Sequence, residues 1–318
     1  MLTKIRRYTI GFLCLYIFAN VVEQIYILNK SDVSFAHVNI DRAQTLNPAP
    51  IACISYADGD PVFYQNQNVQ MFSALNRGFD RFFQYHRKDI DADFYNKNKE
   101  ILGQKRGSGY WLWKPYILLK TLKELPEGAI VFYADSPVIF KSSIEPFIRK
   151  LNDSKADILL LQDGSKRKNN INKAFQTVKS EALSLNGINP NSLEHKYALW
   201  GAFLVVRNTE RGRAFVQAWL SLCENKDALT DQPLNNQKQH PKFKGHSHDQ
   251  ALLFVATQKN PDGITYITTD DLDGIVKNVH RHPHQRMFSL IPDILGCFKI
   301  SEWGYNSKFM QILRSLVY

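Results

Sequence analysis

The chain has 318 residues and a formal net charge of +10 at pH 7, with 44% hydrophobic and 22% charged residues. This composition is typical of a globular protein and excludes intrinsic disorder and fibrous repeats. The four cysteines form no CxxC pair and lie at no zinc-finger spacing. The chain is therefore no disulfide scaffold, and the spacing argues against a structural zinc site.

The positive charge is spread thinly along the sequence. Its densest clusters, residues 4–7 and 166–168, are not interleaved with aromatic residues as a single-strand binding surface would be. The sequence also lacks a helix-turn-helix, RNP or zinc-finger pattern. We therefore do not expect nucleic acid as a partner.

Basic residues precede an uncharged stretch near the start, residues 8–22. Three interpretations remain open: an uncleaved signal-anchor, a cleaved signal peptide, or a buried N-terminal hydrophobic helix. A signal-anchor would give a single-pass membrane protein of type II, with the N-terminus cytoplasmic and the rest in the secretory-pathway lumen or its equivalent. Residues 29–49 are polar and aperiodic, as in a stem or linker. We divide the chain into a signal-anchor or signal segment (1–28), a stem (29–49) and a folded domain (50–318).

The folded domain alternates short apolar runs with segments of helical periodicity. In chain order we predict strands at 51–56, 81–85, 129–134, 157–161, 198–206 and 264–267, and helices at 65–77, 89–104, 113–125, 143–151, 210–223 and 248–258. This alternation predicts an α/β sandwich with a mostly parallel central sheet. Since ligands of such sheets bind beyond the carboxyl ends of the strands, we expect the chemistry at Asp135 and at the loop after Tyr56.

Asp135 directly follows the strand predicted at 129–134. A carboxylate at that position can hold a divalent cation, which in turn holds phosphate oxygens. An Asp before Ser-Pro is equally ordinary turn chemistry, so both interpretations stay open.

The segment 106–115 combines two glycines, three aromatic residues and two cations just before and within the start of a predicted helix. The glycines permit close backbone approach, and the helix N-terminus attracts anions. Arg106 and Lys114 would add positive charge for a diphosphate. Trp111 and Trp113 fit a hydrophobic core equally well.

Two histidine-containing segments follow. Asp249 and Gln250 come directly after His248 and fall in the first turn of a predicted helix, where an acid also interacts favourably with the helix dipole. The alternating histidines at 280–284 could supply one metal ligand.

Four blocks, residues 109–116, 133–136, 201–209 and 248–250, resemble in this order a family of GT-A-like glycosyltransferases. These are relatives of the galactosyl- and glycogenin-type transferases that use nucleotide sugars. The similarity runs through roughly residues 51–285. It implies that the domain 50–318 is a GT-A-like (nucleotide-diphospho-sugar transferase) three-layer sandwich.

Carried over to the matching positions, the resemblance implies a donor site and two catalytic residues. The donor-binding residues would be Ser55, Tyr56, Arg106, Gly109, Trp113 and Lys114. The first two would face the nucleotide base, and the last would contact the diphosphate or the donor sugar. Asp249 and Gln250 would be catalytic, beside the reacting anomeric carbon.

The resemblance also implies a divalent cation, Mn²⁺ or Mg²⁺. Asp135 matches the first acid of the family's Asp-x-Asp motif, and His280 or His282 matches a late metal-binding His. Position 137 is Pro, so the second acid is missing. One carboxylate, one His and two phosphate oxygens can still hold a cation, but metal-independent catalysis stays open.

The expected function is transfer of a sugar from a nucleotide-sugar donor to a glycan or glycoconjugate acceptor. The alternative is a catalytically inactive, membrane-anchored protein that binds carbohydrate or nucleotide on the same fold. Pro137 is the reason to keep that alternative.

Overall fold

A computed structural model describes residues 10–12, 14, 15, 18, 19, 46–75, 77–164, 171–232 and 238–278. The predicted N-terminal segment and stem lie largely outside these residues, and so do His280 and His282. Within the described ranges, no helix is both long enough and apolar enough to cross a membrane.

The described domain is built on a six-stranded sheet with the order β2-β1-β3-β6-β5-β7. Its strands are β1 (Ile51–Tyr56), β2 (Arg81–Tyr85), β3 (Ile130–Ala134), β5 (Ile158–Gln162), β6 (Leu199–Arg207) and β7 (Ile264–Ile267). β6 runs antiparallel to both of its neighbours, whereas the other three pairings are parallel. The mostly parallel sheet is therefore confirmed, with one reversed strand near its centre.

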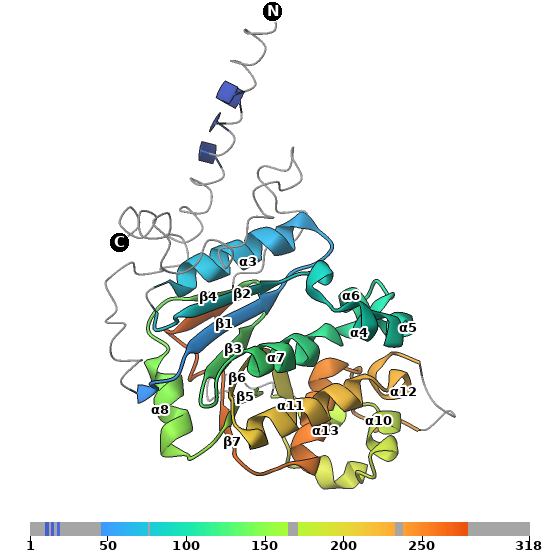
Figure 1. The fold of residues 1–318 in the computed structure, drawn as a ribbon. Coiled ribbons are helices and arrows are strands. Elements are labelled where there is room, and N and C mark those ends of the chain that lie inside the picture. Colours follow the sequence, from blue (N-terminus) through green and yellow to red (C-terminus); the bar gives the residue numbers. More distant parts are fainter. Residues whose placement is uncertain are drawn as a thin grey trace, which may run out of the picture.

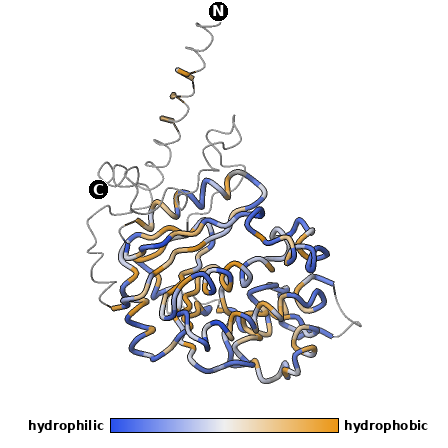
Figure 2. Tube along the Cα trace, viewed as in Figure 1, coloured by the Kyte–Doolittle hydropathy of each residue, from blue (hydrophilic) through white to orange (hydrophobic). Residues whose placement is uncertain are grey.

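Helices cover both faces of this sheet (Figure 1). α3 (Pro61–Ala74) and α8 (Glu145–Asp153) bury their apolar residues against one face. α7 (Trp113–Glu124), α11 (Glu210–Cys223) and α13 (Asp249–Lys259) pack on the other. Figure 2 shows hydrophobic stretches along the sheet and along the helices that cover it. These three layers confirm the predicted sandwich.

Shorter elements complete the fold. They are η1 (Arg87–Asp89), α4 (Ala92–Lys97), α5 (Lys99–Leu102), α6 (Gly107–Tyr110), α9 (Ala174–Thr177), α10 (Ser180–Leu185), η2 (Pro190–Leu193), α12 (Lys226–Leu229), and a separate antiparallel pair, β4 (Val138–Phe140) with β8 (Val276–Asn278).

Two predicted helix boundaries were wrong. α3 begins four residues earlier than predicted, because the Asp60 side chain caps it by accepting a hydrogen bond from the Val62 amide (2.9 Å). The helix predicted at 89–104 is interrupted at Asn98, whose backbone (φ −111°, ψ 20°) separates α4 from α5.

Candidate active site

A cleft of about 530 Å³ opens beyond the carboxyl ends of β1 and β3. Aromatic side chains form much of its wall: Tyr56, Phe63, Trp111, Trp113 and Tyr133. Its charged lining residues are Asp58, Asp60, Lys105 and Asp135. The cleft lies where ligands of parallel sheets bind, as the sequence predicts.

Two of the aromatic residues form a fixed stack. The rings of Tyr56 and Trp113 lie 4.0 Å apart between centroids and 14° from parallel. The Trp113 indole N–H donates a hydrogen bond to the Gly107 carbonyl (2.9 Å), which holds the ring in place. A preorganised aromatic wall of this kind suits a planar heterocycle.

One lysine and two carboxylates converge beside the cleft. Lys114, in the first turn of α7, lies with its Nζ 2.9 Å from Asp249 Oδ2 and 3.6 Å from Asp135 Oδ1. Its ammonium also donates to the Gly201 carbonyl (3.1 Å). The Lys114 and Asp249 side chains are only 5% exposed, whereas Asp135 is 37% exposed and lines the cleft. Asp135 is thus the solvent-facing member of a buried charge cluster.

The environment shifts the pKa values in this cluster. Burial raises the pKa of Asp249 to about 6, against the opposing effect of the Lys114 ammonium. Burial alone would lower the pKa of Lys114, but the two carboxylates outweigh it and raise that pKa above its ordinary value. Lys114 therefore stays a cation at neutral pH, while Asp249 titrates close to the physiological range.

Gly201, at the start of β6, completes the cluster. A Cβ at this position would lie 3.2 Å from Asp249 Oδ2 and 3.3 Å from Lys114 Nζ, so a side chain would press on the ion pair. Its amide donates to Gln250 Oε1 (2.9 Å), which orients that amide side chain. Sequence reasoning included Gly201 only as the first residue of the resembling block 201–209 and gave it no role in the site; a glycine interrupting the apolar run 198–206 was the available signal.

The loop that brings Trp111 to the cleft has a strained backbone. Residues 107–111 all have positive φ, between 51° and 100°, including the non-glycine residues Ser108, Tyr110 and Trp111. Such conformations cost on the order of 1–3 kcal/mol for each non-glycine residue and persist only where the surroundings enforce them. A Cβ on Gly109 would lie 2.6 Å from the Leu102 Cα, so only glycine fits there.

The structure brings most of the predicted site residues together. Tyr56, Trp113 and Asp135 line the cleft, and Lys114, Asp249 and Gln250 gather behind its wall through the contacts given above.

Three predicted donor-binding residues lie elsewhere. Ser55 is fully buried and does not line the cleft. Gly109 is buried against α5, so its role is to allow close packing of the loop. Arg106 points away to Asp231, 3.0 Å from its Oδ2. The geometry gives no support for direct donor contacts by these three residues.

The described residues do not by themselves form a divalent-cation site. Within the described ranges, no group of three or more His, Cys, Asp or Glu residues is placed to hold a metal ion. The Oδ1 of Asp135 already accepts a hydrogen bond from the Tyr133 hydroxyl (2.5 Å) and faces the Lys114 ammonium, which would repel a cation. The other two predicted ligands, His280 and His282, lie outside the described residues.

No family model matches the chain, and no curated protein sequence matches it. The structure is similar to several solved glycosyltransferase structures. One is a glycosyltransferase involved in the glycosylation of the major capsid of PBCV-1 (8% identity, 71% of this chain and 91% of that chain covered, TM-score 0.43). Others are mouse xyloside xylosyltransferase 1 in its apo form (9%, 69% and 85%, TM-score 0.41) and the galactosyltransferase LgtC with donor and acceptor sugar analogues (14%, 68% and 72%, TM-score 0.37).

Proposed function

We propose that the chain is a glycosyltransferase that moves a sugar from a nucleotide-sugar donor to a glycan or glycoconjugate acceptor. The observation that carries this proposal is the convergence of Lys114, Asp135 and Asp249 beside an aromatic-lined cleft. Glycosyl transfer develops negative charge on the departing phosphate and positive charge on the sugar ring. A cation can stabilise the negative phosphate and a carboxylate the positive ring, and in this cluster the two groups lie side by side.

The cleft accommodates the parts of such a donor in different places. The stacked Tyr56–Trp113 wall suits the nucleotide base. Lys105 lines the cleft and Lys114 lies behind it, so both can attract the phosphates. The sugar would then lie toward Asp135, just after β3, and Gln250, in the first turn of α13.

We assign a separate role to each charged group during the reaction. As the bond between the anomeric carbon and the phosphate oxygen breaks, the Lys114 ammonium stabilises the leaving phosphate. The Asp249 carboxylate stabilises the positive ring or orients the acceptor hydroxyl. Both charges are already in place before the reaction, so little reorganisation is needed.

A divalent cation remains a prediction. Asp135 would contribute one carboxylate to Mn²⁺ or Mg²⁺, with His280 or His282 as the expected second ligand and phosphate oxygens as the others. The geometry of the described residues does not require the cation, because Lys114 already places a positive charge beside Asp135.

The alternative is a catalytically inactive protein that binds carbohydrate or nucleotide in the same cleft. Pro137 in place of the second acid, and the incomplete cation site of the described residues, are the observations that favour it. Slow hydrolysis of a nucleotide sugar separates the two, because only a transferase passes the sugar to water.

We also propose that residues 1–28 attach the domain to a membrane in a type II orientation. The large apolar side chains described in this segment, Ile10, Phe12, Leu15 and Phe18, are between 60% and 69% exposed. We expect the full chain to stay in the membrane fraction after alkaline extraction, and added protease to spare the domain in sealed vesicles. Release of the intact full chain into the supernatant would contradict the attachment.

Binding of the donor's nucleotide can be tested by thermal unfolding. The full chain in detergent is titrated with UDP, GDP and CMP, each with and without Mn²⁺. Ligand binding to the folded state raises the melting temperature by mass action. We expect a rise with one nucleotide. A rise in melting temperature that needs Mn²⁺ supports the cation at Asp135. A rise without Mn²⁺ indicates that Lys105 and Lys114 neutralise the phosphate charge. No rise with any nucleotide contradicts the proposed function.

A further inference from the structure

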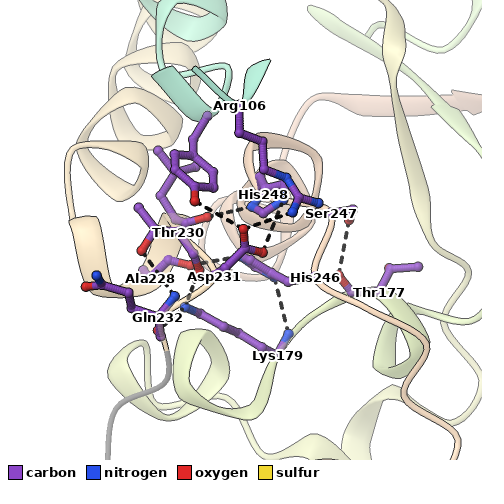
Figure 3. Close-up of polar contacts among 12 residues, drawn as sticks. Arg106, Thr177, Lys179, Ala228, Thr230, Asp231, Gln232, His246, Ser247 and His248 are labelled. Carbon is purple, nitrogen blue, oxygen red and sulfur yellow. Dashed lines mark hydrogen bonds and ion pairs between the residues drawn. The ribbon is translucent and has the colours of Figure 1, made fainter. Parts of the chain in front are cut away.

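One carboxylate holds the cleft-lining loop, residues 105–111, from its outer side. Asp231 Oδ2 accepts hydrogen bonds from Arg106 Nη1 (3.0 Å) and from the Tyr110 hydroxyl (3.1 Å). Figure 3 shows Arg106 reaching down to Asp231 from the loop. We call these three residues the Asp231 clamp.

The backbone on either side of Asp231 is itself anchored. The Lys179 ammonium donates to the carbonyls of Thr230 (2.6 Å) and Gln232 (3.0 Å), the two residues that flank Asp231 (Figure 3). Lys179 is only 4% exposed, so these carbonyls replace the water that its charge would otherwise bind. The carboxylate of the clamp is therefore presented from a fixed position although it is itself half-exposed.

His248 links the same loop to the charge cluster. Its imidazole is 3% exposed, stacks on Trp111 (5.5 Å between centroids, 21°) and meets the Tyr110 ring edge-on (5.0 Å). Its Nδ1 lies 2.9 Å from the Leu229 carbonyl, which only accepts, so Nδ1 carries the proton. The next residue is Asp249. The loop, the Asp231 segment and the start of α13 thus form one contiguous unit.

We propose that Asp231 is a positioning residue for donor binding, an inference that rests on the proposed function. The loop supplies Lys105, Gly107, Ser108 and Trp111 to the cleft. Its consecutive left-handed residues are strained and need external ties to keep that shape. The Asp231 clamp holds the loop from its outer side, and the hydrogen bond from Trp113 to the Gly107 carbonyl holds it from its inner side. Without the clamp, the loop relaxes and the donor loses a preformed wall.

The first test needs no donor. We compare Asp231→Ala with Asp227→Ala, which removes a carboxylate from the first turn of the neighbouring α12 that makes none of the contacts of the clamp. Hydrogen–deuterium exchange of the amides at 105–111 should speed up about tenfold or more in Asp231→Ala and not in Asp227→Ala. The melting temperature should change little, since exposed ion pairs contribute little to global stability. Unchanged exchange in Asp231→Ala would overturn the proposal.

The second test separates binding from chemistry in nucleotide-sugar hydrolysis. Asp231→Ala removes the charged hydrogen bonds of the clamp, so we expect KM to rise about tenfold. We expect kcat to stay within about threefold of wild type. Asp231→Asn keeps an acceptor oxygen and should recover part of the loss. An unchanged KM, or a loss confined to kcat, would overturn the role of Asp231. If the wild type neither hydrolyses nor binds any nucleotide sugar, the proposed function fails. The hydrogen–deuterium exchange test then still decides whether the Asp231 clamp holds the loop.

Discussion

The candidate site depends on a buried lysine that two carboxylates share. Removing one partner of a buried ion pair costs about 3–5 kcal/mol, because the other charge is left without compensation. Lys114→Ala would therefore confuse lost folding with lost function. Asp249→Asn keeps the shape of the side chain and leaves Lys114 its contacts with Asp135 and the Gly201 carbonyl. At the scale of the residue, Asp249 is the better position at which to test the mechanism.

The raised pKa of Asp249 predicts a pH dependence. Above about pH 6 the Asp249 carboxylate is ionised and can stabilise the positive ring. Below that pH, protonation removes its charge. We expect hydrolysis of a nucleotide sugar to fall as the pH is lowered through about 6.

The free energy of unfolding should respond to pH in the opposite sense. Because burial raises the folded-state pKa above the unfolded value, the stabilisation from protonated Asp249 is full at low pH and is lost as the pH rises through about 6.

A pH–rate profile of the wild type checks this expectation, with a pH series of melting temperatures beside it. A rate that stays level while the pH falls through this range would contradict the role of an ionised Asp249.

At the scale of elements, the strands and the long helices follow from apolar patterning. β1, β3 and α7 lie within a residue of their predicted bounds because each is buried with a clear period. Patterning carries no information on strand direction, so the reversal of β6 was not predictable. The loop 107–111 was not predictable either, since local preferences disfavour left-handed Tyr110 and Trp111; tertiary contacts enforce them.

The site residues likewise divide into those that a sequence pattern indicates and those that only tertiary contacts bring into place. The resemblance placed Lys114, Asp135 and Asp249 together, and the structure has them in contact. Asp231 was missed because a lone acid in a polar segment carries no pattern. Arg106 was predicted to meet a phosphate, but its partner Asp231 lies in a distant part of the sequence.

Gly109 provides a prediction for the loop as an element. Gly109→Ala would combine an unfavourable φ of +100° with a Cβ only 2.6 Å from the Leu102 Cα. We expect a loss of about 2–4 kcal/mol in the free energy of unfolding, measured with urea. Gly187→Ala is the matched control: its φ is +67°, but nothing lies within 4 Å of the added Cβ. Equal losses in the two variants would contradict the tight packing of the loop against α5.

At the scale of the whole molecule, the fold brings separate parts of the chain to one edge of the sheet. β1 ends there at Tyr56, Asp135 directly follows the end of β3, and Gly201 is the third residue of the reversed β6. The Asp135 amide donates to the Ala202 carbonyl (2.9 Å), which joins the last two of these segments. α7 and α13 approach from the covering layer and supply Lys114 and Asp249. The antiparallel strand is thus what closes the site behind the cleft.

The most direct test of the account is the hydrolysis of UDP-, GDP- and CMP-sugars by the wild type and by Asp249→Asn. We predict that the wild type releases the nucleotide from one donor class. In Asp249→Asn, turnover should fall by about 10²-fold or more, as for other groups that stabilise transition-state charge. Nucleotide binding and the melting temperature should stay near the wild-type values. Equal turnover in the two proteins, or no hydrolysis of any donor by the wild type, would contradict the proposed mechanism.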